Sequence, residues 1–222
     1  MKTSLSIMLI ISAILFSFTS NAGEIFKITL IRADAGSLLP LLNETKAIRK
    51  EKAGDLIIMR HSQGEQWDVM LLELAQADNV IMQHNLATPI AYQHSFLATA
   101  DQPWEKIKKD ALINDLYHIE MFEAEPMKLN ELIEQRQMEN SYYHATERAG
   151  NVIFTTIFGH DMDVFTLGFY KDLITFATDP DLSDEVFEKA ATDAGFESRG
   201  TIGLYLRELI SSHRDTLATR VN

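Results

Sequence analysis

The sequence predicts an α+β fold in which two related units, each with the element order βαββαβ, follow one another along the chain. Three observations lead to this prediction. Glycines followed by apolar runs recur after 95 to 96 residues, strand-like alternation opens each half, and segments with helical spacing separate the strands. The recurrence indicates an internal duplication, and the other two observations give the order of strands and helices in each half.

The recurrence appears in four segments that keep the same order in both halves. Few residues are identical, but each pair shares its glycine or its apolar alternation. Ordered self-similarity of this kind is typical of a duplicated chain. The matched segments are Phe26–Ile31 with Tyr117–Phe122, Gly54–Ile58 with Gly150–Phe154, Gly64–Leu72 with Gly159–Leu167, and Phe96–Thr99 with Thr216–Thr219.

In the first unit, residues 25–32 alternate with a period of two and are rich in β-formers, which predicts a strand. Ser37 can cap the helix that follows. The apolar runs 55–61 and 67–74 flank a turn that contains glycine and predict a hairpin. Residues 77–92 are expected to contain the second helix of this unit.

The second unit repeats this order with longer helices. Ser183 and Gly195 mark the start and the end of one of them, since serine caps helices and glycine ends them. The predicted elements are a strand at 116–123, a helix from Leu129 to Tyr143, hairpin strands at 151–157 and 162–169, helices at 183–195 and 202–210, and a strand at 215–221.

A βαββαβ unit is the ferredoxin-like motif, and its helices cover one face of its sheet. Two copies in one chain can close their bare faces against each other. At this level the chain resembles the dimeric α/β-barrel superfamily, in a fused tandem version. That superfamily includes antibiotic-biosynthesis-monooxygenase-like proteins, chlorite-dismutase-like haem proteins and NIPSNAP proteins. The resemblance rests on element order and duplication, so it implies the fold.

The predicted organisation is a signal peptide at 1–22, a first unit at 23–100, a link at 101–115 and a second unit at 116–222. Lys2 precedes an apolar run from Leu5 to Phe18, and Ala22 ends a small-residue cleavage pattern. As a helix the run would span roughly 21 Å, less than a bilayer core of about 30 Å. We therefore expect a secreted, periplasmic protein that is cleaved after Ala22.

The composition excludes several classes of function. The chain has 32 Asp and Glu against 20 Lys and Arg, a net charge of −12, which argues against nucleic acid and anionic membranes as partners. It contains no cysteine, so disulfides, thiolate metal sites and thiol nucleophiles are excluded. The sequence motifs of serine hydrolases, zincins and nucleotide-binding loops do not occur either.

The strand at 116–123 offers the first candidate site. If its apolar residues face the helices, then His118, Glu120 and Phe122 point into the barrel lumen. A histidine and a carboxylate on one face can share a proton, which is typical of a general base or a metal ligand. Alternatively, His118 and Glu120 are solvent-exposed strand positions.

The helix that follows offers a second candidate. Arg136, Asn140 and Tyr143 are spaced by four and three residues and therefore share one helical face. With Phe122, this polar face could line a ligand pocket. The alternative is a solvated or interface face.

The turn of the second hairpin and two recurring histidines complete the candidates. His160 and Asp161 could take part in a metal site, but Asp163 has a counterpart in Asp68, in a turn without histidine, which favours a structural role. Histidine recurs shortly before the final matched segment of each half, as His94 and His213.

The leading hypothesis is a binding protein that holds a small apolar or aromatic ligand between the two sheets, without a cofactor. The enzymatic alternative is a cofactor-independent oxygenase or isomerase that uses His118 and Glu120 for proton transfer. A third hypothesis, haem or metal binding, requires a histidine in the lumen. After cleavage of the signal peptide we expect no membrane partner, and the chain would be a monomer or a homodimer.

Overall fold

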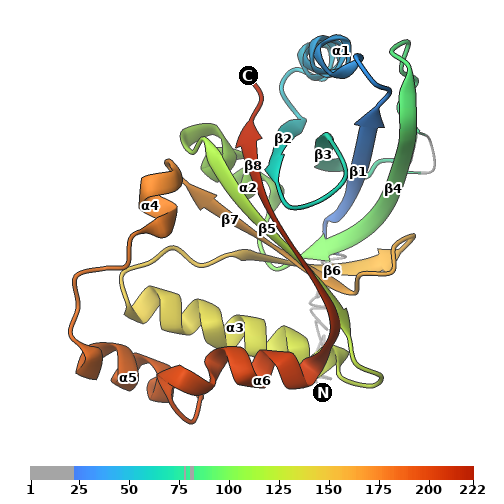
Figure 1. The fold of residues 1–222 in the computed structure, drawn as a ribbon. Helices are drawn as coiled ribbons and strands as arrows, with labels where there is room; N and C mark the ends of the chain where they lie inside the picture. Colours follow the sequence, from blue (N-terminus) through green and yellow to red (C-terminus); the bar gives the residue numbers. More distant parts are fainter. Residues whose placement is uncertain (1–22, 78, 81–82) are drawn as a thin grey trace, which may run out of the picture.

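Eight antiparallel strands close into a single barrel in the computed structural model, which describes residues 23–222 except 78 and 81–82 (Figure 1). The predicted signal peptide lies outside the described residues. Within the described part of the chain, no helix has the length and apolarity needed to cross a membrane.

The elements of the first half and the link come before Leu116, and the elements of the second half follow. The first set is β1 (Ile25–Ala33), α1 (Leu38–Glu51), β2 (Ile57–Gln63), β3 (Val69–Leu74), β4 (Ile90–Ala100) and α2 (Trp104–Ile113). The second set is β5 (Leu116–Ala124), α3 (Leu129–Ala145), β6 (Val152–Phe158), β7 (Val164–Tyr170), α4 (Leu173–Ala177), α5 (Asp184–Asp193), η1 (Arg199–Thr201), α6 (Ile202–Leu209) and β8 (Ile210–Arg220).

The two halves contribute four strands each, in the same spatial order. The first half runs β4-β1-β3-β2 and the second runs β8-β5-β7-β6. The halves join edge to edge, because β2 pairs with β8 and β4 pairs with β6. The predicted fold of tandem ferredoxin-like units in one α/β barrel is therefore confirmed, and each of the eight described strands is paired on both sides.

The barrel lumen is filled by one apolar cluster to which both halves contribute. Tyr117, Ile119 and Met121 of β5 belong to this cluster and are fully buried. The expected orientation of β5 was therefore wrong: its apolar residues face the lumen, and His118 and Glu120 face outward. The interior of an eight-stranded barrel is just wide enough for side chains to fill it, and here apolar side chains do so.

The two halves differ in what covers their outer faces. Helices α3, α5 and α6 lie along one side of the second half (Figure 1). The second helix expected at 77–92 does not form among the described residues of that range, and β4 begins at Ile90. In the second half, α4 was not predicted, and β8 begins five residues before the predicted start at 215.

Asp68 and Asp163 make the same contacts in the two halves. Asp68 Oδ2 accepts a hydrogen bond from Ala33 N at 2.8 Å, and Asp163 Oδ2 accepts one from Ala124 N at 2.9 Å. Both alanines lie where the strand register shifts, so the carboxylates accept hydrogen bonds from backbone N–H groups that the regular strand pairing does not use. The recurring aspartate thus has the structural role that its repetition favoured.

Candidate functional site

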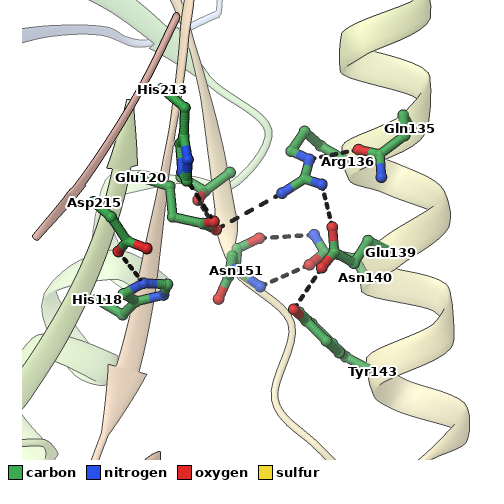
Figure 2. A network of polar contacts seen from close by, with 11 residues as sticks. His118, Glu120, Gln135, Arg136, Glu139, Asn140, Tyr143, Asn151, His213 and Asp215 are labelled. Carbon is green, nitrogen blue, oxygen red and sulfur yellow. Dashed lines mark hydrogen bonds and ion pairs between the residues drawn. The ribbon is translucent and has the colours of Figure 1, made fainter. Parts of the chain in front are cut away.

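The outer face of β5 and β8 carries polar side chains from both strands. His118 and Glu120 lie two residues apart on β5, as His213 and Asp215 do on β8. The antiparallel register places Glu120 opposite Asp215, and it places His213 opposite Phe122. Because side chains alternate along a strand, all of them project from the face on which α3 lies (Figure 2).

Each histidine contacts a carboxylate of the other strand. His118 Nε2 lies 2.6 Å from Asp215 Oδ1, and His213 Nε2 lies 3.5 Å from Glu120 Oε1 (Figure 2). The second oxygen of Glu120, Oε2, accepts a hydrogen bond from Thr166 Oγ1 at 3.1 Å. The expected partnership of His118 with Glu120 is therefore replaced by two cross-strand pairs.

Helix α3 adds a buried cation to this group. Arg136 Nη1 lies 3.7 Å from Glu120 Oε2, and Nη2 contacts Glu139 one turn further along the helix. The guanidinium also lies over the ring of Phe122, at 4.9 Å from its centroid. The hydroxyl of Tyr143 donates to Glu139 Oε1 at 2.6 Å. A continuous series of polar contacts thus connects β8, β5 and α3.

Two of the predicted ligand-binding residues have supporting roles in this arrangement. Asn140 Nδ2 donates to Asn151 O at 2.8 Å, and Asn140 Oδ1 accepts from Asn151 N at 2.7 Å, so this side chain holds the start of β6. Phe122 is fully buried, and the His213 ring stacks on it at 4.9 Å.

The electrostatics favour charged forms of the cross-strand pairs. Burial lowers the pKa of His118, but the hydrogen bond to Asp215 and the charge of Glu120 outweigh burial and raise it above its ordinary value. The same bond to His118 lowers the pKa of Asp215. Burial raises the pKa of Glu120, but contacts with His213 and Arg136 bring it below its ordinary value. Burial raises the pKa of Tyr143, so it stays a neutral donor.

A pocket of about 790 Å³ opens beside His118, on the outer surface of the second half. It lies over β7 and α4 and extends to the end of α3. Rings and a few polar groups share its walls, which is typical of small-molecule sites. Its lining includes His118, Tyr143, Arg148, Phe169, Tyr170 and Phe176. Of the predicted site residues, only His118 and Tyr143 are among the described residues that line it.

The corresponding face of the first half is closed. Lys27 and Thr29 occupy the positions of His118 and Glu120, and both are buried. Lys27 Nζ donates to Asn79 O at 2.8 Å, in the segment between β3 and β4, and Thr29 shares a hydrogen bond with Ser95 at 2.8 Å. The polar faces of the two halves have therefore diverged, as their sequences indicated.

The turn between β6 and β7, which carries His160, is not part of the polar group on β5 and β8. His160 Nδ1 accepts a hydrogen bond from Met162 N at 2.9 Å, and its ring lies 5.2 Å from that of His94. Burial lowers the pKa of His160. One ring nitrogen is thus used inside its own turn. The neighbouring Asp161 contacts Arg214 of β8 at 3.2 Å, and Arg214 projects from the opposite face of β8 to His213 and Asp215.

Sequence reasoning missed the role of Asp215 and did not connect His213 to β5. The signal was present, because His213 and Asp215 repeat the two-residue spacing of His118 and Glu120. It was hidden because the last strand was predicted to begin at 215, which put His213 outside it.

The fold is shared with solved structures of very low sequence identity. Neither protein-family models nor curated proteins give a match. An anthrone oxidase-like protein aligns with a TM-score of 0.61 at 9% identity, over 90% of this chain and 92% of that one. A candidate monooxygenase from Fusobacterium nucleatum gives 0.58 at 10% identity, over 90% and 94%. A candidate chlorite dismutase gives 0.51 at 13% identity, over 90% and 96%.

At such identities the likeness shows the fold alone. It is the ferredoxin-like barrel fold of monooxygenase-like and chlorite-dismutase-like proteins, as the order of elements predicted. The resemblance to NIPSNAP proteins stays a prediction.

Proposed function

We propose that the protein is exported and binds a small aromatic molecule in the pocket beside His118. The observation that carries this proposal is the combination of two rings, Tyr170 and Phe176, with His118 at one wall of a pocket of ligand size. Export rests on the signal-peptide pattern of residues 1–22.

The pocket suits a flat molecule that carries a hydrogen-bonding group. Phe176 meets the ring of Tyr170 edge-on at 5.1 Å and lies 5.0 Å from the ring of His118, so neighbouring rings already pack at this wall. The Arg148 guanidinium lies 4.6 Å from the centroid of the Tyr143 ring. A phenolic ligand would bury its ring against the aromatic wall and present its hydroxyl to His118.

The location differs from the sequence-based hypothesis. That hypothesis placed the ligand between the two sheets, but the described residues of the lumen form a packed apolar cluster. The pocket on the outer surface of the second half is therefore the place where we expect binding.

Titration with 2-naphthol, followed by calorimetry, tests this proposal. The Phe176→Ala variant should bind it about tenfold more weakly or worse, because loss of a buried ring contact costs on the order of 1.5 kcal/mol or more. Phe158→Ala is the matched control, since Phe158 is 75% exposed on β6 and does not line the pocket. Equal affinities of Phe176→Ala and the wild type would contradict the proposal, as would the absence of binding.

An enzymatic role is the second candidate, favoured by the 2.6 Å contact between Asp215 and the pocket-lining His118. Asp215 fixes the orientation of this imidazole beside the pocket, as general bases require. A His118→Gln variant that still binds 2-naphthol but cannot turn over any phenol that the wild type oxidises would support an oxygenase. Full turnover by that variant would exclude His118 as the catalytic residue.

The haem hypothesis uses a histidine nitrogen as the axial ligand of the iron. Nε2 of His118 is bonded to Asp215 at 2.6 Å, so haem binding would cost this bond. We therefore derive no step through a haem. Haem binding stays a prediction, which a haemin titration followed at the Soret band tests directly.

A further inference from the structure

Strands β5 and β8 present two histidines and two carboxylates in a crossed arrangement. His118 and Glu120 on β5 face His213 and Asp215 on β8, with Glu120 directly opposite Asp215. One ligand atom from each of His118, Glu120 and Asp215 lies within 4.8 Å of the others. Nε2 of His213 is 3.5 Å from the Oε1 atom of Glu120 and supplies a fourth.

The direct opposition of Glu120 and Asp215 is unusual, because like charges at opposed positions of an antiparallel pair destabilise it. Arg136 lies 3.7 Å from Glu120, but it also contacts Glu139, so its charge is shared between two carboxylates. The three carboxylates and the guanidinium leave two negative charges to be balanced. Two imidazolium ions can balance them, and so can one divalent cation with neutral imidazoles.

The oxygen atoms of Glu120 are divided in a way that suits a cation. Oε2 is used by Thr166 and Arg136, on the side of α3. Oε1 faces His213, on the side of β8. Asp215 has a 57% exposed side chain and can rotate, so its present 2.6 Å contact with His118 can open to the spacing of two ligands on one ion.

We propose that His118, Glu120, His213 and Asp215 bind one divalent first-row transition metal ion beside the pocket. Imidazole nitrogens with carboxylate oxygens suit zinc, manganese and iron(II), and two histidines with one or two carboxylates are typical of such sites. The proposal goes beyond ligand binding in the pocket and holds whether or not an aromatic molecule binds there.

Arg136, Glu139 and Thr166 would then act as positioning residues. They hold Glu120 from behind, so Oε1 stays directed at β8. Such supporting contacts fix the orientation of metal ligands and affect metal affinity. The ring of Phe122, on which His213 stacks, supports the second imidazole in the same way.

The test uses the chain from residue 23 onward, treated with a chelator and dialysed against zinc chloride, with bound zinc measured by elemental analysis. We expect one zinc per chain. Cobalt(II) is the second probe, since its visible absorption bands report nitrogen and oxygen ligands. Binding to the His213→Ala and Asp215→Asn variants should be weaker by about tenfold or more. Asp215→Asn is the safer variant, because its amide oxygen can still accept from His118 and its position is half-exposed.

His160→Ala is the matched control, because it removes a histidine that contacts an aspartate in the second hairpin turn and is not one of the four proposed ligands. It should bind zinc as the wild type does. The proposal is overturned if the wild type takes up no zinc, if Asp215→Asn and His213→Ala both keep wild-type affinity, or if His160→Ala alone loses the metal. Loss of 2-naphthol binding with intact zinc binding would contradict only the proposed function.

Discussion

At the scale of single residues, Met127 has a left-handed backbone conformation at a turn where the first half has a glycine. Met127 has a φ of +69° and is 97% exposed. Gly36, at the equivalent turn of the first half, has a φ of +85°. The next residues, Lys128 and Ser37, donate to Glu125 and Asp34 in the same way, at 2.9 Å each. A left-handed backbone strains any residue with a Cβ, so this turn is strained in the second half and unstrained in the first.

Replacement of Met127 by glycine should raise the free energy of unfolding by about 0.5–1 kcal/mol. Relief of the left-handed conformation gains about 1–2 kcal/mol, and the greater freedom of glycine in the unfolded chain offsets roughly half of it. Urea denaturation measures the change. Met127→Ala is the control, since it removes the exposed side chain but keeps the strain. A destabilised Met127→Gly variant would refute this account.

Asp163 should contribute as much stability as Asp68, because each carboxylate accepts one hydrogen bond from a strand N–H. Asp163→Ala and Asp68→Ala should each cost about 1.5–3 kcal/mol, the range for hydrogen bonds to charged groups. Asp163→Asn should cost less, since the amide oxygen can still accept. Thermal unfolding of the three variants decides the matter, and an Asp163→Ala variant as stable as the wild type would show that the bond is dispensable.

Several site residues could be predicted from the sequence because their spacing matches the period of a strand or a helix. His118 and Glu120 do share a face, and Arg136 and Tyr143 do share another. Their surroundings could not be predicted, because strand alternation says which residues share a face without saying which face is buried deeper. The pairing of His213 and Asp215 was missed because the predicted strand began five residues late, at Asp215, and so left His213 outside it.

At the scale of elements, the segment between β3 and β4 is held to the first half by Glu73. This carboxylate is buried, and it contacts Lys52 at 2.6 Å and His84 at 3.0 Å. Burial raises its pKa, but the contacts with His84 and Lys52 outweigh burial and bring the pKa below its ordinary value of 4.5. The stabilisation that Glu73 provides is therefore present above about pH 4.5 and lost as the pH falls through the lowered pKa.

A Glu73→Gln variant should lose stability at pH 7 and depend less on pH than the wild type below pH 4.5. Urea denaturation at several pH values measures both effects. Glu105→Gln is the control, because its exposed ion pair with Lys108 contributes little. Parallel pH profiles of Glu73→Gln and the wild type would contradict the assigned contacts.

The elements themselves followed from the sequence where periodicity was strong. Both hairpins and the long helix α3 lie within a few residues of their predicted positions. The helix expected at 77–92 was inferred from the duplication, not from its own apolar spacing. Among the described residues, polar contacts of Lys27 and Glu73 with this segment replace helix packing, and periodicity does not reveal contacts of that kind.

At the scale of the whole molecule, glycines at the two hairpin turns allow the halves to join. A Cβ on Gly64 would lie 2.0 Å from Asp215 O of β8, and a Cβ on Gly159 would lie 3.2 Å from Ser95 O of β4. Both glycines have a positive φ. A glycine thus allows close backbone contact at both junctions of the barrel, but the contact with β8 leaves much less room for a side chain than the contact with β4.

Gly64→Ala should therefore destabilise the protein more than Gly159→Ala does. Both variants incur about 1–2 kcal/mol of backbone strain, and the overlap with β8 adds about 1–3 kcal/mol to the first. Chemical denaturation compares them. Because the displaced atom belongs to Asp215, Gly64→Ala should also weaken zinc binding, whereas Gly159→Ala should not. Equal stabilities of the two variants would show that the β8 backbone can shift away from residue 64 without loss of stability.

The barrel as a whole was predictable because duplication and element order constrain topology strongly. Two ferredoxin-like units in one chain have few ways to shelter both bare faces. The register that joins β2 to β8 could not be predicted, since it depends on Gly64 and its neighbours packing against a strand far away in sequence.

The pairing of β2 with β8 also has a consequence for folding kinetics. Met59 pairs with Arg220, so the chain must close a very long loop before this ladder forms, and such contacts form slowly. Until then both strands keep open edges, which favour aggregation. His213 and Asp215 reach β5 on the same strand, so the group on β5 and β8 is complete only in the closed barrel. A ligand bound there would therefore slow unfolding and leave the folding rate nearly unchanged.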